Sequence, residues 1–138
     1  MGRIVGIDYG ARRVGIAVTD PLKIIATPLE TIPTSEVIAF LTAYDLLEGI
    51  DTYVLGKPVS LQNTATDATK LVLDFEKELR KRWPDKEVVF IDERFTSKIA
   101  KQAMVEGGMK KKARRDKSQV DKLSATLILQ SYLAQIEK

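Results

Sequence analysis

The chain has 138 residues and a net charge of +3, and 44% of its residues are hydrophobic, which suits one domain over 1–138 with a real core. It has no cysteine and no histidine, which excludes disulfides, thiolate metal sites and catalysis by serine–histidine or cysteine–histidine pairs. Any general base or metal ligand must therefore be Asp, Glu, Lys, Tyr or a bound water. No apolar run approaches the roughly 20 residues that span a bilayer, and Met1 begins no signal-peptide pattern, so we expect a cytoplasmic protein without membrane contact.

The first third of the chain predicts three strands that are joined by short turns. Apolar residues of strand type fill 3–8, 14–20 and 23–32. Glycine and arginine residues over 10–13 form the first connection, and Pro21 begins the second. Because connections this short only allow hairpins, we expect the three strands to be antiparallel.

The rest of the chain predicts helices that alternate with strands. Apolar residues recur at helical spacing over 34–48 and in a longer helix that begins near Ala68 and ends before Pro84. Apolar runs at 52–56 and 87–92 predict strands, the second of them covered on both faces. The last two predicted elements are a short helix that is capped by Thr96 or Ser97 and ends at Gly107 and Gly108, and a final helix over 118–136.

This order of elements predicts an α/β fold. Three strands in a meander are followed by two crossover units, and right-handed crossovers make the last two strands parallel to the first. We therefore expect a five-stranded mixed sheet, with three antiparallel strands and then two parallel ones, and with helices on both faces.

Three acids from distant segments are predicted to meet at one edge of this sheet. Asp8 ends the first strand, Glu93 follows the last one, and Asp121 lies in the first turn of the final helix. Ser124 and Ala125 are small and lie one turn later, so that end of the helix can approach the sheet closely. Crowded carboxylates persist where a cation binds, and a site built from oxygen ligands favours Mg²⁺ or Mn²⁺.

Each acid also has a local interpretation. Asp8 suits an Asx turn before Gly10, Glu93 suits the first turn of a helix, and Asp121 can complete a capping box with Ser118. The strand–Asp–Gly turn is also similar to that of sugar kinases and Hsp70-like ATPases, but those proteins need two such lobes and a much longer chain. The convergence of three acids therefore depends on the predicted topology.

Four segments, which are spread along nearly the whole chain, resemble those of a known family. They are "GIDYGARRVGIAVTD" at 6–20, "VLGKP" at 54–58, "IDERFTS" at 91–97 and "KSQVDKLSATLILQSYL" at 117–133. On these motifs the sequence resembles the YqgF/RuvX family, small bacterial proteins of the RNase H-like superfamily that are related to the RuvC resolvase. The resemblance implies an RNase H-like fold.

The resemblance also implies a metal-dependent endonuclease whose catalytic and metal-binding residues are Asp8, Glu93 and Asp121. In a two-metal-ion phosphodiesterase, Asp8 would contact two ions about 3.5–4 Å apart, and Glu93 and Asp121 would hold one ion each. Family members are described as nucleases that mature the 5′ end of pre-16S rRNA, which is the function we expect here. Alternatives are a Holliday-junction resolvase in DNA recombination and repair, and a nucleic-acid-binding module of the same fold without catalysis.

Several cations lie where they can meet phosphates. Arg12 and Arg13 follow the first strand and either clamp phosphate oxygens or remain solvated. Family members often have an apolar residue between the glycine and proline of the second motif, where this chain has Lys57, a cation that can meet a phosphate. Arg94 either neutralises charge near the scissile phosphate or pairs with Asp92.

The segment 110–117, "KKKARRDK", carries a charge of +5, whereas the rest of the chain carries −2. It is either a solvated loop or a site that holds backbone phosphates without reading sequence. We expect a nucleic-acid partner, an RNA precursor or branched DNA, and a monomer or weak homodimer, because no clear interface patch stands out. The contacts predicted in this segment are Lys110, Lys111, Lys112, Arg114, Arg115 and Lys117.

Overall fold

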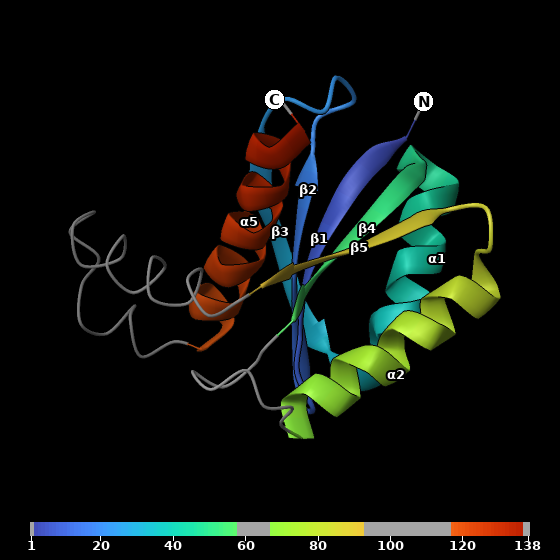
Figure 1. Ribbon diagram of the computed structural model, residues 1–138, viewed down its shortest axis with the longest axis vertical. Coiled ribbons are helices and arrows are strands. Elements are labelled where there is room, and N and C mark those ends of the chain that lie inside the picture. The colour runs from blue at the N-terminus through green and yellow to red at the C-terminus, as the bar shows by residue number, and fades with distance from the viewer. Residues whose placement is uncertain (1, 58–66, 93–116, 137–138) are drawn as a thin grey trace.

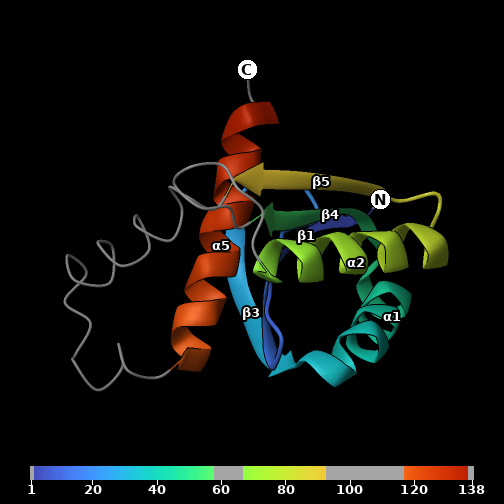
Figure 2. The same ribbon diagram turned by 60° about the horizontal axis from the view of Figure 1, so that its bottom comes forward.

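The computed structural model describes residues 2–57, 67–92 and 117–136, which form a five-stranded sheet with helices on both faces (Figures 1 and 2). Within these ranges no helix has both the length and the apolar character needed to cross a bilayer. The predicted short helix at 96–108 lies outside the described residues. The elements are β1 (Arg3–Tyr9), β2 (Arg13–Thr19), β3 (Ala26–Pro33), a 3₁₀ turn η1 (Thr34–Glu36), α1 (Val37–Glu48), β4 (Ile50–Lys57), α2 (Asp67–Arg82), β5 (Glu87–Asp92) and α5 (Lys117–Ile136).

The strand pairing confirms the predicted topology. The strand order is β3-β2-β1-β4-β5. β1 and β2 are antiparallel, as are β2 and β3, whereas β4 is parallel to both β1 and β5. The carboxyl ends of β1, β4 and β5 therefore share one edge of the sheet, which is where ligands bind in open α/β sheets.

The two faces of the sheet carry separate cores. On one face, Ile7 and Leu55 pack with the apolar sides of α1 and α2. On the other, Ile4 and Val54 pack against α5 through residues such as Leu129. Because side chains alternate along a strand, the odd-numbered residues of β1 face α1 and α2, and the even-numbered residues face α5.

Helix α5 lies very close to β1 because the contact residues are small. A Cβ added to Gly6 would lie 2.8 Å from the Leu129 Cβ and 2.9 Å from the Ala125 carbonyl oxygen. Ala125 is fully buried, and Ser124 is nearly so. The predicted close approach of this part of the helix to the sheet is therefore confirmed.

The sequence predicted that the third strand begins at residue 23, but in the structure it begins at Ala26. The Asp20 carboxylate accepts backbone N–H bonds from Leu22, Ile24 and Ile25, at 3.2, 2.8 and 2.8 Å. Lys23 has a φ of 61°, in the left-handed region. These bonds hold the chain in a turn, so the apolar side chains of Ile24 and Ile25 are exposed and do not enter the sheet.

The Asp20 turn predicts a specific acid sensitivity. Backbone donation from Ile25, then Ile24, lowers the pKa of Asp20 below its ordinary value of 3.8. The stability that this carboxylate contributes is therefore complete above that value and is lost as the pH falls through the lower, folded-state pKa. Asp20→Asn keeps an acceptor oxygen but cannot be protonated. Denaturant unfolding between about pH 5 and about pH 2 should show a larger loss of stability in the wild type than in the variant, and parallel losses would contradict this account.

Candidate functional site

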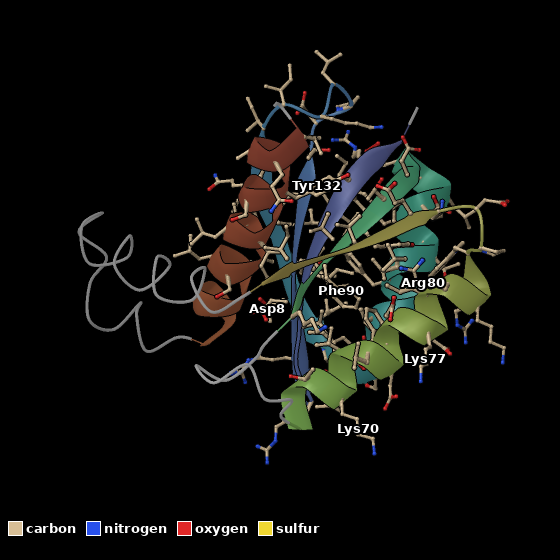
Figure 3. All side chains as sticks on the ribbon, in the orientation of Figure 1. Asp8, Lys70, Lys77, Arg80, Phe90 and Tyr132 are labelled. Atoms are coloured by element: carbon tan, nitrogen blue, oxygen red, sulfur yellow. The ribbon has the colours of Figure 1, made fainter. Side chains whose placement is uncertain are left out.

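Asp8 is half-buried near the carboxyl end of β1, on the face that α5 covers (Figure 3). The chain turns back immediately afterwards, because the Gly10 N–H donates to the Arg13 carbonyl oxygen at 3.1 Å. A Cβ at Gly10 would lie 2.7 Å from that oxygen, so the turn requires glycine. The turn places the Arg12 backbone beyond the strand end that carries Asp8.

The register of α5 on β1 sets the height of Asp121 along the sheet. Gly6 lies against Ala125 and Leu129, and α5 runs in the opposite direction to β1 (Figure 1). Asp121 precedes Ala125 by one helical turn, a rise of about 6 Å, and Asp8 follows Gly6 by two strand residues, about 6.6 Å. The backbone positions of Asp8 and Asp121 are therefore at nearly the same height, on the same side of the sheet.

The other predicted ligands lie at the limit of the described chain. β5 ends at Asp92, whose backbone is paired with Lys57 of β4 at the same sheet edge. Glu93, Arg94 and residues 110–116 lie outside the described residues, and of Lys117, Asp92 and Asp121 only the backbone is described. Among the described side chains no three potential metal ligands gather. The donor atoms that the predicted site offers are all carboxylate oxygens, which fit a hard divalent cation.

The predicted phosphate-binding cations are distributed over two faces. Arg12 is exposed and Arg13 half-buried, both at the β1–β2 turn. The Lys57 Nζ lies 5.5 Å from the centre of the Phe90 ring, a cation–π contact on the face of α1 and α2. The structure therefore does not bring Lys57 together with Asp8, because the sheet lies between them.

A hollow of about 290 Å³ opens at the same edge of the sheet, on the face opposite Asp8. Sequence patterns did not point to it, although the alternation along β1 indicates that Tyr9 and Asp8 face opposite sides. Six of the residues that line it are Tyr9, Thr34, Ile38, Leu71, Asp74 and Phe75.

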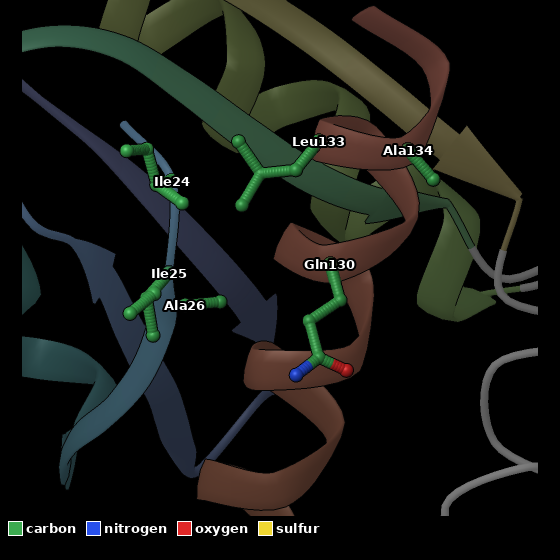
Figure 4. A pocket seen from close by; sticks show the side chains of 6 residues that line it. All are labelled: Ile24, Ile25, Ala26, Gln130, Leu133 and Ala134. Atoms are coloured by element: carbon green, nitrogen blue, oxygen red, sulfur yellow. The ribbon is translucent and has the colours of Figure 1, made fainter. Parts of the chain in front are cut away.

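A second hollow, of about 320 Å³, lies at the other end of the sheet, beside the β2–β3 turn (Figure 4). Its walls are mostly apolar. They come from Ile24 and Ile25 beside the turn, and from Gln130 and Leu133 in the last turns of α5. With no ionisable side chain in its lining, this hollow has no group for acid–base or metal chemistry. The candidate site is therefore the edge that carries Asp8.

Comparison with known proteins identifies close relatives along the whole chain. Residues 2–135 match the family model RuvX, described as "Holliday junction resolvase". A protein of Amoebophilus asiaticus named "Putative pre-16S rRNA nuclease" is 45% identical over 138 residues, which cover 100% of this chain and 98% of the relative. A protein of Phocaeicola vulgatus with the same name is 47% identical over 133 residues, 96% of each chain.

Solved structures show the same fold at low sequence identity. RuvC of Thermus thermophilus in complex with a Holliday junction substrate has a TM-score of 0.58 and 19% identity, and the alignment covers 99% of this chain and 96% of RuvC. The likeness confirms the RNase H-like fold that the sequence predicted. With a family model that matches almost every residue and relatives above 40% identity along the whole length, this chain belongs to the RuvX family.

Proposed function

We propose that residues 1–138 form one nuclease domain that hydrolyses phosphodiester bonds in structured nucleic acid, with the 5′ end of pre-16S rRNA as its substrate in the cytoplasm. The names of relatives at 45% and 47% identity support this substrate. The observation that carries the chemistry is the register of α5 on β1. Close contact at Gly6 accompanies backbone positions of Asp8 and Asp121 at nearly the same height along the sheet. Two acids that share one cation would need to be level in this way.

In this proposal Asp8, Glu93 and Asp121 hold Mg²⁺ or Mn²⁺, because carboxylate oxygens suit hard divalent cations. The bound metal supplies positive charge at the scissile phosphate and a more acidic water. Asp8 is half-buried beside the α5 contact, at a position of β1 that pairs with Gly15 of β2. Arg12 and Arg13 bind phosphate oxygens of the substrate and orient its backbone. No histidine is needed for these roles, in keeping with a chain that has none.

A second candidate is cleavage of Holliday junctions. The description of the matching family and the RuvC fold both favour it. Symmetric cleavage of a junction requires two copies of the active site, so this function also requires a homodimer. Simple binding without cleavage, as a third candidate, would leave three acids beside a phosphate backbone that they repel.

Cleavage assays separate these functions. The purified protein and its Asp8→Asn variant are incubated with a pre-16S rRNA fragment, a four-way DNA junction and a linear duplex, each with Mg²⁺ or Mn²⁺. We expect the wild type to shorten the 5′ end of the RNA and Asp8→Asn to leave it intact. Junction cleavage alone would favour the resolvase, and binding without cleavage of any substrate would contradict nuclease activity.

The basic segment 110–117 predicts the salt dependence of substrate binding. If its cations bind phosphates, replacing its six Lys and Arg residues with alanine should weaken binding to all sequences alike, because phosphates carry no sequence information. The slope of log affinity against log salt for a duplex should become shallower by about 0.9 for each phosphate that the variant no longer neutralises. An unchanged slope, measured by fluorescence anisotropy, would show that the segment is a solvated loop.

A further inference from the structure

The hollow on the face opposite Asp8 is lined by a stacked aromatic pair. The rings of Tyr9 and Phe75 lie 4.2 Å apart, centre to centre, with 20° between their planes. Phe75 is almost fully buried, so it fixes the Tyr9 ring from the core side, while Tyr9 itself is only half-buried. Leu71, exposed on α2, and Ile38, half-buried on α1, add apolar walls. With a volume of about 290 Å³, the hollow is close to the lower limit of roughly 300 Å³ for small-molecule sites.

Hydrogen-bond acceptors stand at the rim of this aromatic hollow. Asp74 is exposed and forms no ion pair with any residue that the structure describes, whereas Glu78 is paired with Arg82 at 2.8 Å. Asp74 and Glu78 line the hollow together with Tyr9. Burial raises the pKa of the Tyr9 hydroxyl, and the charges of these two carboxylates raise it further. The hollow therefore offers an aromatic surface with a carboxylate acceptor beside it.

The backbones of two cationic residues, Arg12 and Lys57, lie at the sheet edge beside the hollow. Thr34, in its lining, donates from its N–H to the Arg12 carbonyl at 3.1 Å and from its hydroxyl to the Gly10 carbonyl at 2.7 Å. The rim is thus bonded to the turn that carries Arg12. Lys57 lies on the same face as Tyr9, since each follows the paired residues Ile7 and Leu55 by two positions. A ligand that fits this surface combines a flat apolar ring, an N–H donor and a negative charge.

We propose that this hollow binds an unpaired nucleobase of the substrate, with the adjoining phosphates held by Arg12 and Lys57. The base stacks in the aromatic hollow, and its exocyclic amino group donates to Asp74, as cytosine N4 does to carboxylates in other complexes. The proposal rests on the proposed function for its nucleic-acid substrate. Because Tyr9 directly follows Asp8 on the opposite face, the bound base belongs to a nucleotide near the cleaved bond but not at it. A cationic protein side chain could also meet the aromatic rings and Asp74, so an arginine-rich peptide is the competing ligand in the test below.

Binding of short single strands tests the base preference. Labelled five-nucleotide RNAs of cytidine or of uridine are titrated by fluorescence anisotropy into wild type, Asp74→Asn and Asp85→Asn. Asp85 is exposed after α2 and away from the hollow, so it controls for the loss of one negative charge. We expect wild type and Asp85→Asn to bind the cytidine strand about 5- to 10-fold more tightly than the uridine strand, and Asp74→Asn to bind both equally. Equal binding of both strands by the wild type, or a preference that survives Asp74→Asn, would overturn the proposal.

Stacking is tested with a second pair of variants and a second readout. Tyr9→Leu should lower the affinity for both RNA strands by roughly 5- to 150-fold, whereas Tyr9→Phe should bind them as tightly as the wild type does. Methyl NMR signals of Leu71 and Ile38 should shift on adding the cytidine strand. Shifts caused only by an arginine-rich peptide would assign the hollow to a protein partner and overturn the proposal. Cleavage is measured on the same proteins: intact cleavage without base preference refutes only the base site, and base preference without cleavage refutes only the nuclease.

Discussion

Asp8→Asn is expected to abolish cleavage and yet to raise the melting temperature of the protein without metal. Unit charges about 4 Å apart repel by roughly 1–4 kcal/mol at effective dielectric constants of 80 to 20. If Asp8, Glu93 and Asp121 converge as proposed, folding brings these charges together, and the variant removes one of them at nearly constant shape. Each kcal/mol gained should raise the melting temperature by about 3–4 °C in a chain of this size.

Magnesium should stabilise the wild type more than it stabilises the variant. A free concentration about 100-fold above the dissociation constant stabilises a protein by about 2.7 kcal/mol, so the wild type should gain more from Mg²⁺ than the variant does. Local roles for these acids predict a different result. Asp8→Asn should then leave the melting temperature almost unchanged, because Asn also suits an Asx turn, and Mg²⁺ should change the melting temperature of neither protein. Melting curves that coincide with and without Mg²⁺ for both proteins would mean that the three acids form no metal site.

The topology could be predicted because the strand and helix signals are local and the connections allow few arrangements. The short turns predicted at 10–13 and from Pro21 allow only hairpins, and each later strand follows a helix, which makes it parallel. The close approach of α5 was also predictable, because Ser124 and Ala125 are small where the helix meets the sheet. These features depend on residue size and spacing, which a sequence displays directly.

Other features depended on side-chain hydrogen bonds and on which face a residue occupies. Ile24 and Ile25 have strand propensity, but the Asp20 carboxylate holds their backbone N–H groups in a turn. Lys57 has the right charge for a phosphate contact, but its position in β4 places it on the opposite face from Asp8. The aromatic hollow at Tyr9 combines residues of β1, α1 and α2, and no motif indicates such a set.

Gly6→Ala should damage the proposed site more than it damages the fold. The added Cβ would lie 2.8 Å from the Leu129 Cβ and 2.9 Å from the Ala125 carbonyl oxygen, and neither atom can rotate away. Helix α5 must therefore move outward, at a cost of about 1–3 kcal/mol. Since the same contact sets the height of Asp121 relative to Asp8, a shift of about 1 Å can lower the cleavage rate by about 100-fold.

A matched control separates this effect from destabilisation alone. Val5 precedes Gly6 on β1, is fully buried, and packs on the other face with α1 and α2. Val5→Ala deletes two methyl groups and should cost about 2 kcal/mol, in the same range as Gly6→Ala. Single-turnover cleavage is measured well below both melting temperatures, with melting curves for each variant. We expect Val5→Ala to cleave within a few-fold of the wild type and Gly6→Ala to lose about two orders of magnitude. Equal losses in the two variants would mean that the contact between α5 and β1 supports the fold but does not align the acids.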